Sequence, residues 1–167
     1  MILTVQQKQL LKDWILANMP SAGDQEIADA LNAPSAPAFW AWRTNVLKSE
    51  YTNSVGPEGT TFSWSGAGGF IARSAGEQNA WRELFNGTLS VDPSKSNVRQ
   101  AFADIFSGAG AAAVANRAHT TAVSRRVATV GEKIFATGTG TSGSPGTMAI
   151  GCEGDVTLQN VVDALSL

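Results

Sequence analysis

The sequence predicts a mainly α-helical fold of the α+β type: a helical bundle with a small antiparallel β-hairpin or sheet and a glycine-rich loop or arm. Apolar residues recur at three- and four-residue spacing over most of the chain, most clearly in Val98, Ala101, Phe102, Ile105 and Phe106. Two short aromatic stretches alternate in the manner of strands, and glycines gather in the ranges 56–69 and 138–154.

Length and composition limit the classes of protein that the chain can represent. Its 167 residues, 43% hydrophobic and 16% charged, suit one domain over residues 1–167. The formal net charge of -2 argues against a strongly basic face for nucleic acid. The single cysteine, Cys152, excludes an internal disulfide and a cysteine-cluster metal site. We expect no membrane span and no signal peptide, hence a protein used in a cytoplasm or assembled there into something larger.

The first half of the chain predicts two helices and a hairpin. Thr4 caps a helix over residues 5–18 that Pro20 ends, and Ser21 opens a second helix over residues 22–32. Residues 40–46 alternate as a strand that could pair with a second strand over residues 60–65. A short turn of helix is expected over residues 48–53.

The second half predicts four further helices and one more strand. They are expected over residues 69–86 (ended by Gly87), from Ser94 or Ser96 to 107, over 109–121 and over 123–136, before a strand near residues 148–151. Thr157 then caps a last helix, LQNVVDAL. Residues 138–154 are expected to form the glycine-rich loop or arm within the domain.

Several residues were weighed as catalytic, cofactor or metal sites. The segment GTGTSG (138–143) matches G-x-G-x-x-G, but a helix precedes it and Pro145 follows, so a flexible loop is the better interpretation. His119 is the only histidine and is interpreted as a packing or helix-surface residue. We therefore predict no catalytic residue, no cofactor and no metal site.

The remaining polar candidates have simpler interpretations as well. Glu153 and Asp155 are too few for a calcium loop, and Cys152 is interpreted as a small packing residue. Arg117 and the pair Arg125-Arg126 could contact phosphate, but a solvated or interhelical face fits them better.

The stretch FWAWRTNV (39–46) gathers two tryptophans around one arginine. We interpret Trp40 and Trp42 as seating a hairpin on the helical core with Trp64 opposite, and a contact between subunits is the alternative. On this interpretation Trp42→Ala costs about 3–5 kcal/mol of stability. Arg43 would point the other way, free to meet a partner.

Three segments together resemble a known family. They are FWAWRTNV (39–46), DPSKSNVRQAF (92–102) and GEKIFATGTGTSGSPGTMAIGCEGDVTLQNVVDAL (131–165). They are similar to a family of small, uncharacterised structural or morphogenesis proteins of tailed bacteriophages. Its members share an aromatic-x-x-W-R-T element, a central helix with tryptophan, an S-K-x-N-[VI]-R helix start and an EK-x-FATGTGT-x-x-SP-x-TM-x-x-EG tail. The resemblance covers nearly the full length. The chain departs from the pattern in TTFSWSGAGG and in the extra IGC before EG, which leaves the loop geometry open.

The resemblance implies a structural virion protein of the neck or tail, and three hypotheses follow. The first is a ring-forming head-to-tail connector or adaptor subunit without catalysis, which contacts portal or tail proteins in the virion. The second is another virion component, such as a capsid decoration or a tail accessory, and the third is a non-virion host-interaction module or an enzyme. Weak contact of a ring with passing DNA stays open. The candidate subunit-interface residues are Trp40, Trp42, Arg43, Gly138, Gly140, Pro145 and Met148.

Overall fold

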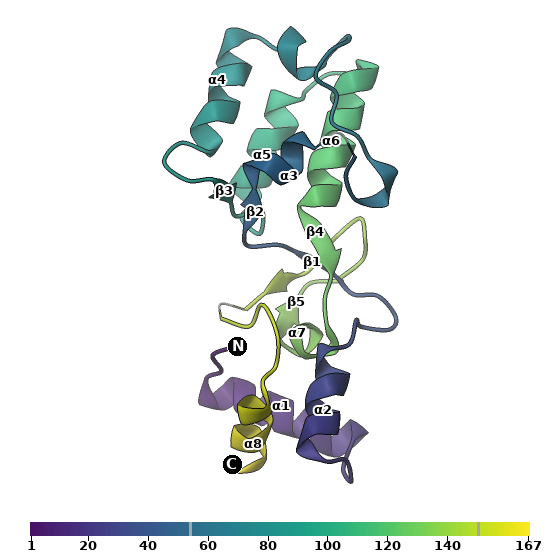
Figure 1. The fold of residues 1–167 in the computed structure, drawn as a ribbon, viewed down its shortest axis with the longest axis vertical. Coiled ribbons are helices and arrows are strands. Elements are labelled where there is room, and N and C mark those ends of the chain that lie inside the picture. The colour runs from purple at the N-terminus through teal and green to yellow at the C-terminus, as the bar shows by residue number, and fades with distance from the viewer. Residues whose placement is uncertain (54, 150) are drawn as a thin grey trace. The chain divides into compact units, whose positions relative to one another are not determined.

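The computed structural model describes residues 1–53, 55–149 and 151–167 (Figure 1). It is 49% helical and its strands form two-stranded antiparallel sheets, so the predicted mainly α class is confirmed. The chain divides into two compact units, which are described separately here. Unit 1 comprises Met1–Ala41 and Val127–Leu167, and unit 2 comprises Trp42–Arg126. This division does not test the prediction of one domain over residues 1–167, which stays a prediction.

Unit 1 is built from four helices and one short hairpin. Its elements are α1 (Val5–Asn18), α2 (Asp24–Asn32), α7 (Val130–Phe135), β5 (Ala136–Thr137), β6 (Thr147–Met148) and α8 (Leu158–Leu165). Figure 1 shows α1 beside α8, so helices from opposite ends of the sequence lie side by side. Their apolar faces close over a core that includes Leu11, Ile15, Leu31 and Val161, each at most 1% exposed.

Threonine caps begin three of these helices. Thr4, Thr129 and Thr157 each form a capping box with the residue three positions on, which satisfies backbone N–H groups that a helix start leaves open. The predicted helix over residues 5–18 and the predicted cap Thr157 are confirmed. The prediction for Ser21 is wrong, because α2 begins after Gly23 and has no side-chain cap.

Unit 2 is a helical unit around an aromatic core. Its elements are β2 (Val46–Leu47), α3 (Lys48–Thr52), η1 (Pro57–Gly59), η2 (Phe70–Ala72), α4 (Ala75–Leu84), β3 (Ser90–Val91), α5 (Ser96–Ile105) and α6 (Ala111–Val123). At its centre lie Tyr51, Trp81 and Phe102. The ring centroids of Tyr51 and Phe102 are 4.8 Å apart. The chain passes between the units within β1 (Trp40–Trp42) and β4 (Arg125–Val127), which pair.

The strand predictions were only partly right. The strand expected over residues 40–46 ends at Trp42, and residues 60–65 are irregular, so the predicted pairing of these two segments is wrong. Instead β2 pairs with β3, with Val46 opposite Val91. The strand expected near residues 148–151 is observed as Thr147–Met148, and Ile150 lies outside the described residues.

Three helix boundaries also differ from prediction. The helix expected over residues 123–136 is β4 followed by α7, because the capping box at Thr129 starts a new helix. The one expected over residues 69–86 is η2 followed by α4, whose C-cap is Phe85, two residues before Gly87. Neither Ser94 nor Ser96 caps α5, since Ser96 is its first residue and Lys95 stands at the cap.

Candidate functional site

A cleft in unit 2 collects the charged and aromatic side chains that best fit a binding site. It lies between α5 and α6, beside Trp42, and has a volume of about 250 Å³. Its lining residues are Trp42, Arg99, Phe102, Ala103, Arg117, Thr120, Thr121 and Ser124. The lining holds two arginines and no carboxylate, so the cleft presents positive charge together with hydroxyl groups. We call it the arginine cleft.

Arg99 enters the arginine cleft from α5 and stacks on Trp42. The guanidinium carbon lies 4.5 Å from the centre of the Trp42 ring, in cation–π geometry. Nη1 donates to the carbonyls of Pro93 and Ser94, each at 2.7 Å, just before α5 begins. Burial lowers the pKa of Arg99, while Asp92 acts in the opposite direction. Trp42 therefore lies half-buried against a cation and is not part of the aromatic core of unit 2.

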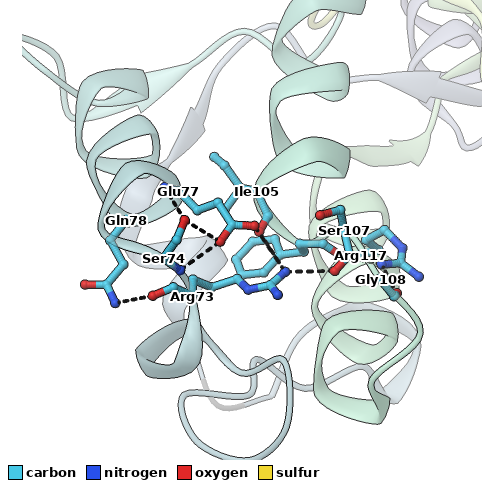
Figure 2. Close-up of polar contacts among 9 residues, drawn as sticks. Arg73, Ser74, Glu77, Gln78, Ile105, Ser107, Gly108 and Arg117 are labelled. Carbon is cyan, nitrogen blue, oxygen red and sulfur yellow. Dashed lines mark hydrogen bonds and ion pairs between the residues drawn. The ribbon is translucent and has the colours of Figure 1, made fainter.

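Arg117 enters the same cleft from α6 and binds the C-terminal end of α5. Its Nη1 donates to the carbonyls of Phe106 and Gly108. Arg73 donates to the carbonyls of Ile105 and Ser107, at 3.0 and 2.8 Å (Figure 2). Two arginines thus satisfy the carbonyls that a helix end leaves open, where the helix dipole favours positive charge.

Arg43 is not free, contrary to the prediction, and its role at a subunit interface stays a prediction. Its guanidinium binds Glu50 through two nitrogens, at 2.7 and 3.1 Å, and also donates to the Val123 carbonyl at 3.1 Å. Burial would raise the pKa of Glu50, but the hydrogen bonds from Arg43 and the Leu47 N–H outweigh it and hold the pKa below its usual value. Arg43 therefore fastens α3 to the end of α6.

The glycine-rich tract lies against its own unit. In unit 1 the Trp40 N–H donates to Gly140 O at 2.7 Å, and the Gly146 N–H donates to Trp40 O at 2.8 Å. Gly140, Pro145 and Met148 are buried, whereas Gly138 is exposed. Of the predicted interface residues, Trp40 and these four lie in unit 1, and Trp42 and Arg43 lie in unit 2. In unit 2 the Trp64 ring packs on Phe62 and Phe70.

His119 and its neighbours form a buried polar cluster. His119 Nε2 lies 3.1 Å from Tyr51 O, and because a carbonyl only accepts, Nε2 carries the proton. Nδ1 faces the Thr60 hydroxyl at 3.2 Å, and the Tyr51 hydroxyl lies 2.8 Å from that of Ser124. Burial is the main cause that lowers the pKa of His119. These groups hold Tyr51 and Thr60 on α6, which agrees with the interpretation of His119 as a packing residue.

A second hollow in unit 2 is apolar. A groove of about 480 Å³ is lined by Leu47, Lys48, Ser49, Thr52, Trp64 and Leu89. The three large apolar side chains remain exposed, at 45% for Leu47, 45% for Trp64 and 80% for Leu89. Exposed apolar side chains gathered around one groove are typical of an interaction surface. We call this the apolar groove.

Sequence reasoning missed how unevenly charge is distributed. Unit 2 carries nine lysines and arginines against six carboxylates, a formal net charge of +3, and unit 1 carries three against eight, a net charge of −5. The net charge of -2 for the whole chain conceals this difference. Counting charges by segment would have revealed it, although the division into units comes only from the structure.

Arg125 and Cys152, two further candidates from the sequence, have contacts that maintain the fold. Arg125 binds Glu58 with a nitrogen–oxygen distance of 2.9 Å. Cys152 is buried in the core of unit 1, and burial raises the pKa of its thiol. Within residues 1–53, 55–149 and 151–167, no three His, Cys, Asp or Glu side chains are placed to hold a metal ion, and no helix is long and apolar enough to span a membrane.

Comparison with known proteins gave no match: no family model, no curated protein and no solved structure is significantly similar to this chain.

Proposed function

We propose that the chain is a structural subunit of a tailed-bacteriophage virion, and specifically a ring-forming head-to-tail connector or adaptor without catalytic activity. The observation that carries the assembly role is the apolar groove of unit 2. Leaving Leu47, Trp64 and Leu89 exposed around one hollow costs free energy that a covering neighbour would recover. The resemblance of three segments to phage morphogenesis proteins supports the virion as the place of assembly.

The buried polar cluster supports a structural role for the residues most suited to catalysis. The chain's one imidazole lies between the Tyr51 carbonyl and the Thr60 hydroxyl, and the Ser124 hydroxyl lies 2.6 Å from the Thr120 carbonyl. A nucleophile or general base has to reach a substrate, whereas these groups are buried and bind the chain itself. Their hydrogen bonds maintain the fold of unit 2.

Quantitative mass spectrometry of purified particles tests the proposal. We expect the chain at a fixed, ring-like copy number per particle. A copy number that scales with the capsid surface would indicate a capsid decoration protein and contradict the connector role. Absence from particles would overturn the virion role altogether.

Two variants test the apolar groove itself. Leu89→Ser should leave the free energy of unfolding nearly unchanged because Leu89 is 80% exposed, whereas Trp64→Ser should lower it by about 1–2 kcal/mol because the ring packs on Phe62 and Phe70. Both variants should lower incorporation into particles. Val114→Ser is the matched control, since Val114 is 48% exposed on α6 and lies outside the groove. Equal incorporation of all three variants would exclude the groove as an assembly surface.

A further inference from the structure

We propose that copies of this chain associate head to tail, with the arginine cleft of unit 2 receiving exposed carboxylates from unit 1 of the next copy. This inference rests on the oligomeric part of the proposed function and specifies its interface. The contact joins two different surfaces. One copy uses its cleft and keeps its acidic surface for the next contact, while its partner uses its acidic surface and keeps its cleft. Such a heterologous contact repeats around a ring when the rotation closes.

Charge complementarity identifies a second copy as the occupant. Unit 2 has a net charge of +3 and unit 1 a net charge of −5, so unlike units of neighbouring copies attract and like units repel. A DNA duplex would also be drawn to the cleft, but the acidic unit of every copy would repel its phosphates. The charges therefore favour a copy of this chain over nucleic acid.

The chemistry of the arginine cleft fits carboxylates. Arg99 and Arg117 each use Nη1 for backbone carbonyls, and a guanidinium has five N–H groups, so further donors remain on both side chains. The Nη1 bonds also fix each guanidinium in place, which lowers the entropy lost on binding. The Thr121 hydroxyl adds a neutral donor, and about 250 Å³ accommodates one or two carboxylate side chains.

Unit 1 offers suitable carboxylates in Asp24 and Glu26 of the first turn of α2, besides the carboxylate of Asp155. Asp24 and Glu26 are both exposed, and neither forms a hydrogen bond or ion pair with another described residue. Other carboxylates of the unit are engaged: Asp29 accepts from Gln25 at 2.8 Å, and Asp163 binds Lys8 at 2.7 Å. Asp155 lies beside the N-terminal ammonium, which donates to its carbonyl at 3.0 Å, so we assign Asp24 and Glu26 to the neighbouring cleft.

Sedimentation velocity of the full chain tests the inference. Wild type should form oligomers at about 50 mM NaCl and dissociate at about 500 mM, because salt screens charge pairs. Arg99→Gln/Arg117→Gln should weaken association by at least about tenfold. Arg82→Gln/Lys95→Gln removes the same charge from exposed positions of unit 2 outside the cleft and should associate like wild type. A wild type that stays monomeric at low salt would overturn the inference.

A variant of the acidic surface covers the case in which the arginine variant loses its fold. Asp24→Asn/Glu26→Gln changes only exposed groups and should weaken association to the same extent. Mixed in equal amounts, the arginine variant and the carboxylate variant should form 1:1 dimers and nothing larger, because one intact cleft then meets one intact acidic surface. Larger oligomers in the mixture, or oligomers of the carboxylate variant alone, would contradict the assignment.

The remaining outcomes separate the two proposals. If the wild type is monomeric and binds duplex DNA through Arg99 and Arg117, the occupant of the arginine cleft is nucleic acid, and the proposed contact between copies is wrong. A monomer that is nevertheless found in particles would overturn this inference alone. Salt-sensitive head-to-tail oligomers that are absent from particles would overturn the virion role and leave the interface standing.

Discussion

The side chain of Asn116 pairs with both backbone polar groups of Ser63. Its Oδ1 accepts from the Ser63 N–H at 2.7 Å, and its Nδ2 donates to the Ser63 carbonyl at 3.0 Å. One buried amide on α6 thus takes the place that a neighbouring strand would fill, and it positions Phe62 in the core of unit 2. Asn32 makes the same pair with Val156 in unit 1, at 2.8 and 2.9 Å.

Asn116→Ala should lower the free energy of unfolding by about 2 kcal/mol, because it leaves the part-buried Ser63 N–H without its acceptor, whereas the Ser63 carbonyl keeps the Phe70 N–H at 3.1 Å. Urea denaturation measures the change. Asn97→Ala is the control, since Asn97 is exposed on α5, and it should stay within about 0.5 kcal/mol of wild type. Equal effects of the two substitutions would show that the Ser63 segment does not depend on Asn116.

The local rules that predicted helix starts explain what the sequence could show. Thr4 and Thr157 were found because a capping box lies within four residues and depends on nothing else in the fold. The same signal, Thr129 followed by Glu132, was overlooked because Val127 and Val130 fit one helical stripe. The segment over residues 60–65 alternates like a strand, but its partners are the Asn116 side chain and scattered backbone N–H groups such as those of Phe70 and Ile71, which alternation cannot reveal.

The candidate site was less predictable than the fold. Trp42 was predicted to seat a hairpin, with a contact between subunits as the alternative, and the structure places it in the lining of the arginine cleft. Arg99 and Arg117 come from two helices and meet Trp42 only through tertiary packing, so no spacing in the chain connects the three. Arg43 was misplaced because alternation gives the direction of a side chain only while the strand continues, and β1 ends at Trp42.

Trp42→Ala should cost less than the 3–5 kcal/mol expected for a core tryptophan. Its half-buried ring loses a cation–π contact with Arg99 and part of its burial, about 1–2 kcal/mol in all. Trp81→Ala is the reference, because Trp81 is 2% exposed and should cost about 3–5 kcal/mol. Chemical denaturation measures the free energy of unfolding of both variants. A larger loss of stability for Trp42→Ala than for Trp81→Ala would show that Trp42 is a core residue.

Arg43→Ala should destabilise the isolated chain by about 1–2 kcal/mol, since it removes the ion pair with Glu50 and leaves the Val123 carbonyl without this donor. A double-mutant cycle with Glu50→Ala should give a coupling of about 0.5–1 kcal/mol. Unchanged stability together with weakened assembly would restore Arg43 as a partner-binding residue.

The stability of the protein should fall as the pH drops below 6.5, in part because of His119. Burial holds its pKa in the folded chain below the ordinary value of 6.5, so the unfolded chain takes up the proton first. The contribution of neutral His119 to the free energy of unfolding is complete above pH 6.5 and is lost as the pH falls through the folded-state pKa of His119. Urea unfolding at about pH 7.5 and about pH 5 should show a smaller difference for His119→Gln than for wild type. Equal differences would mean that His119 titrates alike in both states.

Gly140 and Gly143 lie three residues apart in the glycine-rich tract. Substitution by alanine should lower the free energy of unfolding at Gly140 and leave it nearly unchanged at Gly143. Gly140 has a φ of 65°, and an added Cβ would overlap the Phe39 ring, whereas a Cβ on Gly143 would meet open space. Gly140→Ala should therefore cost at least about 1–2 kcal/mol from its left-handed backbone alone, and Gly143→Ala should stay within about 0.5 kcal/mol of wild type. Urea denaturation of the isolated chain measures both. If the tract were an arm that orders only on a partner, both substitutions would leave the isolated chain unchanged. A loss confined to Gly140→Ala would instead show that the tract is closed over Phe39 before any partner binds.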